Sequence, residues 1–340
     1  MNQEEIEEYL TEMLEKSERE IDQVFAGRLK SLLDLLGKMH RKHGDGEAIS
    51  QTEIYKLNRF EKEMERIKEQ LHSDYTKLYQ EINALMKAQY LQNYLRSGYV
   101  YEMTAMMDMG YQIPAAETVN QAILNPIKEL TLSSLMNQHR NEIIRKIRVE
   151  LGQGIQAGES YSQMATRLED AVGFSRNKAR RVARTESGRA QTNGRLASGE
   201  QAQQYANLEK TWMAELDTRT RTAHRKLDGQ EANEDGNFEY RGMEAPGPSR
   251  WNIPSMDINC RCDIFYKVNG KTPDSRRARD YTDAKYQQRL ADRMDELMNN
   301  EGLTEKQAQD KAKRQIYPPN KVVNWTTYED WYDSLKKASG

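Results

Sequence analysis

One stretch of the sequence stands apart from the rest: Trp212-Met-Ala-Glu-Leu-Asp217-Thr-Arg219-Thr-Arg221-Thr-Ala-His224, which continues to Asp228-Gly229 and is followed later by Asn259-Cys260-Arg261-Cys262. Both cysteines and two of the four tryptophans lie between Trp212 and Cys262. On either side, apolar residues recur at steps of three and four, which is typical of helices. We therefore expect a small α+β module carried by long helices, in a mainly α protein.

Within this module, strands are predicted for residues 208–216 and 262–268, with a short strand around Phe238 and Tyr240. Asp217 is expected to cap a helix that begins at Thr218 and ends at Gly229. Spacings of four, three and four would place four polar side chains on one face of that helix: Asp217, Arg221, His224 and Asp228.

The cysteines and His224 suggest a metal site. Thiolates at Cys260 and Cys262 with the imidazole of His224 could hold zinc, with Asp217 or Asp228 as a fourth ligand. The alternative is a buried polar cluster in which Arg221 and Arg261 pair with the aspartates, while the cysteines pack as small hydrophobes. We favour that alternative, because Cys-x-Cys supplies only two sulfurs. No orienting group for a Cys–His catalytic dyad is evident.

The N-terminal part predicts a helical arm over residues 1–130. An apolar stripe predicts a helix over 1–37, with Gly37 as its stop. A second helix is expected to start near Ser50, where Glu53 completes a capping box, and to run to Ser97-Gly98. Its apolar steps alternate near three and four, so a coiled-coil-like antiparallel hairpin is predicted.

Two interpretations are open for the methionine-rich segment that follows. Met103, Met106, Met107 and Met109 could fill a core or pack against a partner protein, and we favour the core. Further helices are expected from Leu132 to about Leu151 and after Ser160, which is expected to cap the second of them. A turn at Gly173-Phe174-Ser175 is predicted before a basic helix. Helix, turn and basic helix resemble a helix-turn-helix unit.

Charge is strongly segregated, although the formal net charge is only −2. Residues 1–20 carry eight acids against two bases, and residues 176–195 carry seven bases against one acid. Such segregation suggests distinct partner surfaces. Five basic side chains are candidates for nonspecific DNA contact: Arg176, Lys178, Arg180, Arg181 and Arg184. For Glu186, which lies among these arginines, a salt-bridge network is preferred over a catalytic role.

Composition narrows the classes of protein to which this chain can belong. Mean hydropathy is −0.96 with 31% charged residues, which suits long exposed helices better than one sphere. Two cysteines make no disulfide framework, so a reducing compartment is expected. No apolar run reaches the length of a membrane span, and no signal peptide is recognisable. The protein is expected to be soluble and made in a cytoplasm.

The C-terminal part, residues 269–340, is predicted to be a helical tail. A charged helix is expected over about 275–299, and another from Thr304 to the prolines at 318 and 319. An aromatic stretch ends the chain and could anchor a partner or dock on the protein itself.

Several ordered motifs together resemble the phage Mu protein F-like family, the minor head or head morphogenesis proteins of tailed bacteriophages. The resemblance covers about residues 130–268, and a domain of residues 131–268 is assigned on it. Relatives often carry His or Pro just before the Asn-Cys-Arg-Cys element, where this chain has Asp257 and Ile258. The matching positions are Arg184, Thr185, Glu186, Trp212, Asp217, Arg219, Thr220, Arg221, His224, Asp228, Gly229, Asn259, Cys260, Arg261 and Cys262.

The resemblance implies a virion component present in few copies. Such a protein would act in procapsid assembly at the portal vertex, bind the portal protein and other head proteins, and contact packaged DNA. It would be found in the host cytoplasm during assembly and then in the capsid interior or at the portal vertex. The alternative is a metal-dependent nuclease or hydrolase using Asp217, His224, Asp228 and the two cysteines, but no catalytic constellation is convincing.

Overall fold

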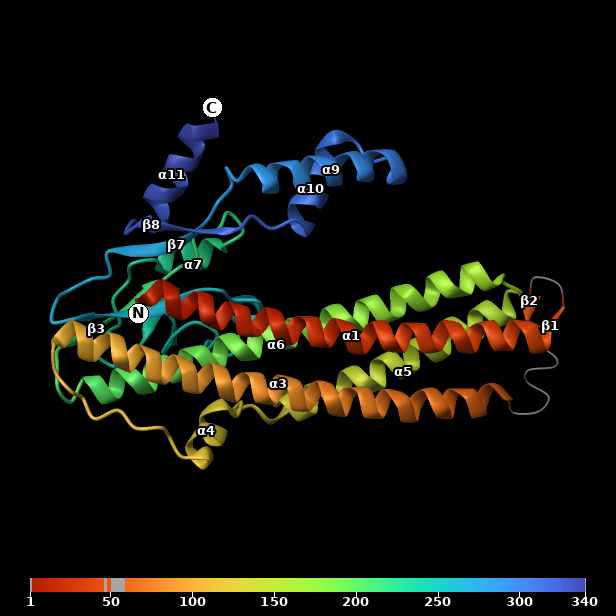
Figure 1. Cartoon of the computed structure of the whole chain (residues 1–340), viewed down its shortest axis with the longest axis horizontal. Coiled ribbons are helices and arrows are strands. Elements are labelled where there is room, and N and C mark those ends of the chain that lie inside the picture. The colour runs from red at the N-terminus through yellow and green to blue at the C-terminus, as the bar shows by residue number, and fades with distance from the viewer. Residues whose placement is uncertain (1, 46–47, 50–58, 340) are drawn as a thin grey trace.

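Two very long helices set the length of the molecule. In the computed structural model, which describes residues 2–45, 48–49 and 59–339, α1 spans Gln3–His43 and α3 spans Arg59–Ala105. They lie antiparallel along the long axis (Figure 1). Short strands β1 (Gly44–Asp45) and β2 (Ala48–Ile49) pair after α1. The predicted hairpin is therefore present. Its proposed cap at Ser50 and Glu53 falls outside the described residues.

Both helices run past the glycines that were expected to end them. Beyond Gly37, Met39 is buried, so the apolar stripe of α1 continues and the helix reaches His43. Gly98 lies inside α3, where a Cβ would come within 2.6 Å of the Tyr111 ring. The prediction of helix stops there was wrong, because Gly98 is required for close packing rather than for a turn.

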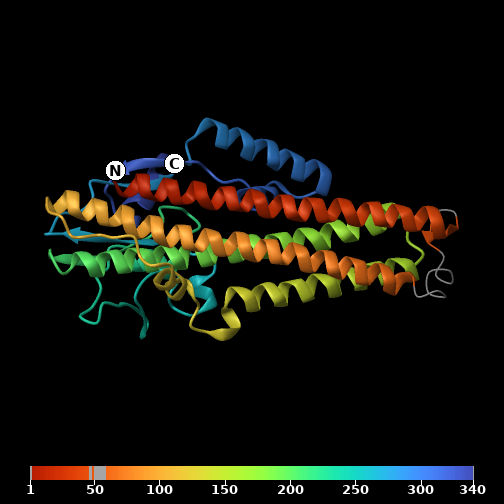
Figure 2. The same cartoon turned by 60° about the horizontal axis from the view of Figure 1, so that its bottom comes forward.

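A second antiparallel pair completes the bundle. After the short α4 (Ala116–Ile123) and the 3-10 turn η1 (Lys128–Leu130), α5 spans Leu132–Gln156 and α6 spans Tyr161–Ala202. Ser160 and Gln163 form the capping box of α6. The four long helices share one apolar core, so the hairpin is part of a bundle rather than a free coiled coil (Figure 2).

The helix-turn-helix prediction was wrong. Helix α6 is continuous through Gly173, where an added Cβ would meet nothing within 4 Å. Residues on both sides of this glycine, including Leu168, Val172 and Ala179, belong to the same buried stripe. Burial of that stripe offsets the roughly 1 kcal/mol helix penalty of a glycine, so no turn is needed.

The module after the bundle is built on two antiparallel strands. Strand β3 (Leu208–Met213) pairs with β6 (Asp263–Val268), so that Trp212 faces Ile264. Helix α7 (Thr222–Leu227), the hairpin of β4 (Phe238–Tyr240) and β5 (Met243–Ala245), and α8 (Pro254–Asp257) lie between them in sequence. The predicted strands are confirmed, and Trp212 is fully buried at the centre of the module.

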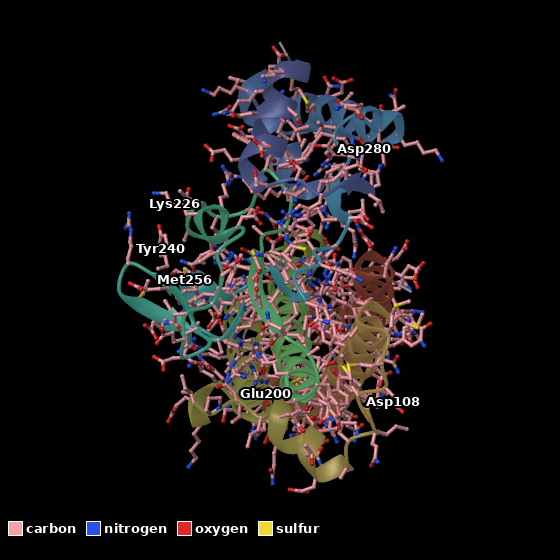
Figure 3. All side chains as sticks on the ribbon, turned by 90° about the vertical axis from the view of Figure 1, so that its left-hand side faces the viewer. Asp108, Glu200, Lys226, Tyr240, Met256 and Asp280 are labelled. Carbon is pink, nitrogen blue, oxygen red and sulfur yellow. The ribbon has the colours of Figure 1, made fainter. Side chains whose placement is uncertain are left out.

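The tail docks on this module. Strand β7 (Ser275–Arg279) pairs with β8 (Asn320–Asn324), while α9 (Ala284–Glu301) and α10 (Glu305–Gln315) form a small helical pair. Helix α11 (Tyr328–Ser339) packs Tyr328 and Trp331 into the module's core. Figure 3 looks along the bundle and shows the tail, with Asp280 labelled, on the opposite side from Asp108.

Two tail predictions are resolved by this arrangement. The helix expected from residue 275 begins at Ala284 instead, because residues 275–279 pair with β8 and alternate between buried and half-buried. The aromatic stretch docks on the protein's own body rather than standing free. The assignment of residues 1–130, 131–268 and 269–340 as separate domains stays a prediction.

Candidate functional site

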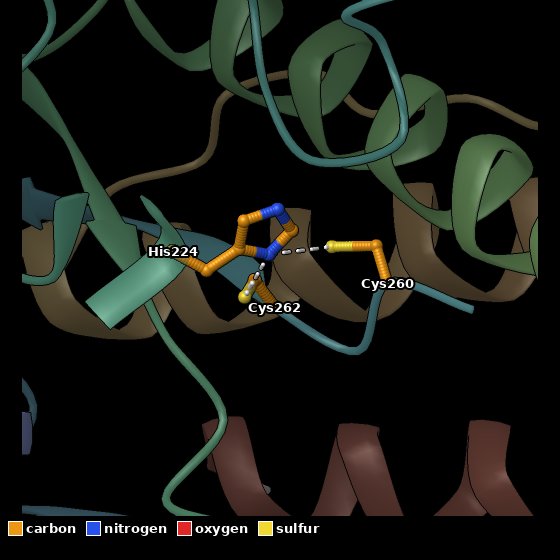
Figure 4. Close-up of side chains that lie close together, drawn as sticks. All are labelled: His224, Cys260 and Cys262. Atoms are coloured by element: carbon orange, nitrogen blue, oxygen red, sulfur yellow. Dashed lines mark hydrogen bonds between the residues drawn. The ribbon is translucent and has the colours of Figure 1, made fainter. Parts of the chain in front are cut away.

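Three potential metal ligands meet in the module. His224 lies on α7, and Cys260 and Cys262 lie on the segment that leads into β6. The Nδ1 atom of His224 is 3.2 Å from Sγ of Cys262 and 3.4 Å from Sγ of Cys260 (Figure 4). All three ligand atoms lie within 4.8 Å of one another. The structure thus brings together the three residues that the sequence suggested as metal ligands.

Local geometry explains why the two sulfurs point the same way. One residue separates them, and alternate residues of an extended segment share a side. Arg261, between them, points to Asp217 instead, at 2.6 Å. The turn before Cys260 contains Asn259 in a left-handed conformation, with φ +54°. Its backbone N–H donates to Thr185 Oγ1 on α6, which ties the cysteine segment to the bundle.

The thiol pair is electrostatically asymmetric. A hydrogen bond from Cys262, together with the neighbouring His224, holds the pKa of Cys260 well below its usual value despite burial. Burial and the adjacent Cys260 raise the pKa of Cys262. Of the two thiols, Cys260 is therefore the one that loses its proton more readily.

Asp217 is a buried structural anchor. Its side chain is fully buried and accepts hydrogen bonds from Tyr281 Oη at 2.7 Å and from the Arg219 backbone N–H at 2.8 Å. Burial would raise the pKa of Asp217, but Arg261 and these hydrogen bonds outweigh it and hold the pKa below its usual value. Asp217 does not cap a helix at Thr218, because α7 begins only at Thr222. The shared helix face was therefore a wrong prediction.

The Arg-Thr-Arg segment after Asp217 binds backbone carbonyls. Arg219 donates to the carbonyl of Ile316 at 2.8 Å and stacks on the Tyr317 ring. Thr220 Oγ1 donates to Glu215 O at 2.7 Å. Arg221 donates to the carbonyls of Met256 and Ile258. The expected carboxylate pairing is confirmed for Arg261 and was wrong for Arg221.

Asp228 joins the module to the tail. Its carboxylate accepts from the Ala214 backbone N–H at 2.7 Å, from the Tyr328 backbone N–H at 2.7 Å and from Arg276 at 3.0 Å. Gly229, with φ +77°, follows as expected for a helix end. Sequence reasoning missed Arg276, Tyr281 and Tyr328 as partners, because they lie in a different segment and nothing in local spacing marks them.

The residues of the Arg-Thr-Glu motif on α6 also make contacts that hold elements of the fold together. Arg184 pairs with Glu18 of α1, and Thr185 holds Asn259. Glu186 and Arg189 form a buried ion pair, and Arg189 also donates to the Ile123 carbonyl at 2.7 Å. The expected salt-bridge role of Glu186 is thus confirmed.

Much of the basic helix is neutralised within the chain. Arg180 binds Glu18 at 2.5 Å and Asp22 at 3.5 Å, both on α1. Arg176 approaches Asp22 at 4.0 Å, and Lys178 binds Glu142 at 2.5 Å. Arg181 is exposed. The segregated charges of residues 1–20 and 176–195 therefore face each other, at least in part, instead of forming two separate surfaces.

A charged cleft lies between α1, α6 and the module. Its volume is about 660 Å³, and His224, Cys260 and Cys262 are in its wall. Nine arginines and six acids are among its lining residues, so the cleft is polar and of mixed charge. The arginines are Arg19, Arg180, Arg184, Arg219, Arg221, Arg261, Arg276, Arg277 and Arg279.

The chain has recognisable relatives. The model of the family described as "Phage Mu protein F like protein" matches residues 145–265. Minor head protein GP7 of Bacillus phage SPP1 is 42% identical over 280 residues, which is 82% of this chain and 91% of that protein. The NAD(+)--arginine ADP-ribosyltransferase EFV of Enterococcus faecalis is 26% identical over 257 residues, or 75% of this chain and 53% of that protein. No solved structure matches.

Proposed function

Because this chain belongs to the Phage Mu protein F like family of phage minor head proteins, we propose that it acts in procapsid assembly at the portal vertex, by binding the portal protein and other head proteins. The observation that carries the proposal is the similarity to GP7 over 91% of that protein's length. It extends well beyond residues 145–265, so it includes parts of the helical bundle as well as the module.

The proposed docking surface is the end of α3 with the segment that follows it. Three apolar side chains there are strongly exposed: Met103 at 60%, Met106 at 88% and Ile113 at 75%. Met109, in the same segment, is fully buried. The core interpretation of the methionines thus holds for Met109 and was wrong for the others. Flexible exposed methionines suit adaptable protein contacts, and large apolar side chains supply much of an interface's energy.

Co-sedimentation with purified portal oligomers tests this surface. The variant Met103→Glu/Met106→Glu/Ile113→Glu is expected to weaken association about tenfold or more, because charged side chains resist burial in an interface. Val322→Glu is a matched control, since Val322 is 62% exposed on β8. Equal loss in both variants, or no association of the unmodified chain, would refute the proposed surface.

Contact with packaged DNA has weaker support. Salt-sensitive binding requires lysines and arginines that are available to phosphates, whereas Arg180 and Arg184 are occupied by Glu18. Arg181 and Arg176 are the exposed members of the set, and Arg176 approaches Asp22 only at 4.0 Å. A DNA affinity that is steeply salt-dependent and falls on charge reversal at Arg180, Arg181 and Arg184 would restore this role.

The hydrolase alternative is not supported. Asp217 and Asp228 are held by arginines and backbone N–H groups, so neither is available as a general base. In the described part of the chain, the metal-ligand cluster contains neither aspartate. No helix in the described ranges has the length and apolar character that crossing a bilayer requires. We propose assembly in the host cytoplasm, followed by residence in the virion.

A further inference from the structure

We propose that His224, Cys260 and Cys262 bind one structural Zn²⁺ through Nδ1 and the two Sγ atoms, with a water from the adjacent cleft as the fourth ligand. The proposal rests on the geometry of these three side chains and does not depend on the portal-binding role. It replaces the aspartate ligands considered from the sequence, since both aspartates are engaged elsewhere.

The distances fit a tetrahedral zinc site. With Zn–S of about 2.3 Å and Zn–N of about 2.0–2.1 Å, the S···N edge of such a tetrahedron is about 3.5 Å. The observed Nδ1–Sγ separations are 3.2 and 3.4 Å, and both sulfurs converge on the same nitrogen (Figure 4). An arrangement of two sulfurs around one ring nitrogen needs only a small outward movement to admit the ion.

Although Cys262 also bonds to Cys260, the hydrogen bonds of this cluster leave one ring nitrogen shared between two sulfurs. A ring nitrogen carries either one proton or one lone pair, so Nδ1 can make one good hydrogen bond and not two. His224 and Cys260 are buried, where unsatisfied polar groups are costly. One zinc ion satisfies all three ligand atoms at once. Two thiolates also balance its charge, so the filled site is neutral and can be buried.

The surroundings of the site indicate which group fills the fourth coordination position of the zinc. In the part of the chain that the structure describes, only these three residues form a metal-ligand cluster. All three line the cleft of about 660 Å³, which is roomy enough for water to reach the metal. Three protein ligands and one water also form the pattern of catalytic zinc sites. Here the nearby aspartates form ion pairs and cannot act as a general base, so we assign a structural role to the metal.

The zinc would fasten the module together. It would link α7 to the segment before β6, across 38 residues of sequence. That segment is also tied to α6 through Asn259 and Thr185. Metal binding to a site that does not exist in the unfolded chain stabilises the fold directly. The zinc would therefore hold the module against the bundle and keep the wall of the cleft in place.

Metal analysis of the full chain tests the proposal. We expect about one zinc per chain, and loss of it in Cys260→Ser, Cys262→Ser and His224→Ala. His139→Ala, which changes a half-buried histidine on α5, should keep the metal. Chelation should lower the Tm by about 5 °C or more, and added zinc should restore it.

Zinc K-edge X-ray absorption is measured on the unmodified chain, so its result does not depend on whether the variants fold. The expected spectrum has two sulfur and two nitrogen or oxygen neighbours. Absence of metal after incubation with Zn²⁺ under reducing conditions would overturn the proposal. A metal shell that contains no sulfur would also overturn it.

Discussion

Arg261 shows how one residue between two cysteines organises the module. The sulfurs on either side turn toward His224, and the guanidinium turns toward the fully buried Asp217. The sequence correctly indicated both the His–Cys–Cys grouping and an arginine–aspartate pairing. It could not show that Arg221 binds carbonyls instead, because this depends on where residues 256–258 lie in the fold.

Asp217→Asn is expected to reduce the free energy of unfolding by about 2 kcal/mol, because the amide loses the ion pair with the partly exposed Arg261 and weakens the hydrogen bonds from Tyr281 and the Arg219 backbone. The pKa of Asp217 is lower in the folded protein than in the unfolded chain. Its stabilising contribution is therefore present above the unfolded pKa and lost as pH falls through the folded pKa. Urea unfolding between pH 3 and 7 measures both effects. Asp333→Asn, in an exposed ion pair, should change stability by under about 0.5 kcal/mol.

The contribution of Glu7 to stability depends on pH in the opposite direction from that of Asp217. Burial and the neighbouring carboxylate of Asp263 raise the pKa of Glu7 to about 7, although Arg277 and Arg195 oppose the shift. Between the unfolded pKa and 7, the folded state binds more protons, so stability falls as pH rises through this window. Glu7→Gln should stabilise the protein by about 1 kcal/mol or more at pH 8 and have little effect at pH 4. A loss of stability at pH 8 would contradict this account.

At the scale of elements, α6 depends on small residues where it meets α3. A Cβ at Gly194 would lie 2.3 Å from the backbone oxygen of Tyr90, which cannot move aside easily. The run of small residues in α6 allows a neighbouring helix to come this close. It could not identify α3 as that neighbour, since local spacing carries no information about which helix packs there.

Gly194→Ala is therefore expected to destabilise the protein by about 2–3 kcal/mol through overpacking. Gly173→Ala is the matched control on the same helix, because no atom lies within 4 Å of the place that a Cβ would take there. It should stabilise the protein by about 0.5–1 kcal/mol through improved helix propensity. Thermal unfolding of both variants measures the contrast. Equal effects would show that α3 and α6 do not pack as described.

Helix ends were the least predictable part of the fold. Gly37, Gly98 and Gly173 all suggested breaks, and each lies inside a continuous helix. Apolar stripes continue past them, and tertiary burial outweighs the local preference of glycine. The strands of the module were easier to predict, because they are short apolar runs bounded by turn residues.

At the scale of the whole molecule, the tail completes the module. Tyr328 and Trp331 pack into the module's core, and the backbone N–H of Tyr328 binds Asp228. These contacts join segments 100 residues apart, which periodicity cannot reveal. The sequence left open whether the aromatic end serves a partner or the chain itself, and the structure shows the second.

Opposite charges from distant parts of the chain also meet. The acidic start of α1 lies against the basic part of α6, with Glu18 between Arg180 and Arg184. The docking surface that we propose lies elsewhere, at the end of α3 and in the segment that follows it, on the side away from the tail (Figure 3).

The most direct test of the central claim is site-specific photo-crosslinking in assembling procapsids. A photo-crosslinking residue in place of Met106 is expected to attach the chain to the portal protein, whereas the same residue in place of Val322 is not. Crosslinks from position 106 that reach only other head proteins, or equal portal crosslinking from both positions, would contradict docking on the portal through this segment.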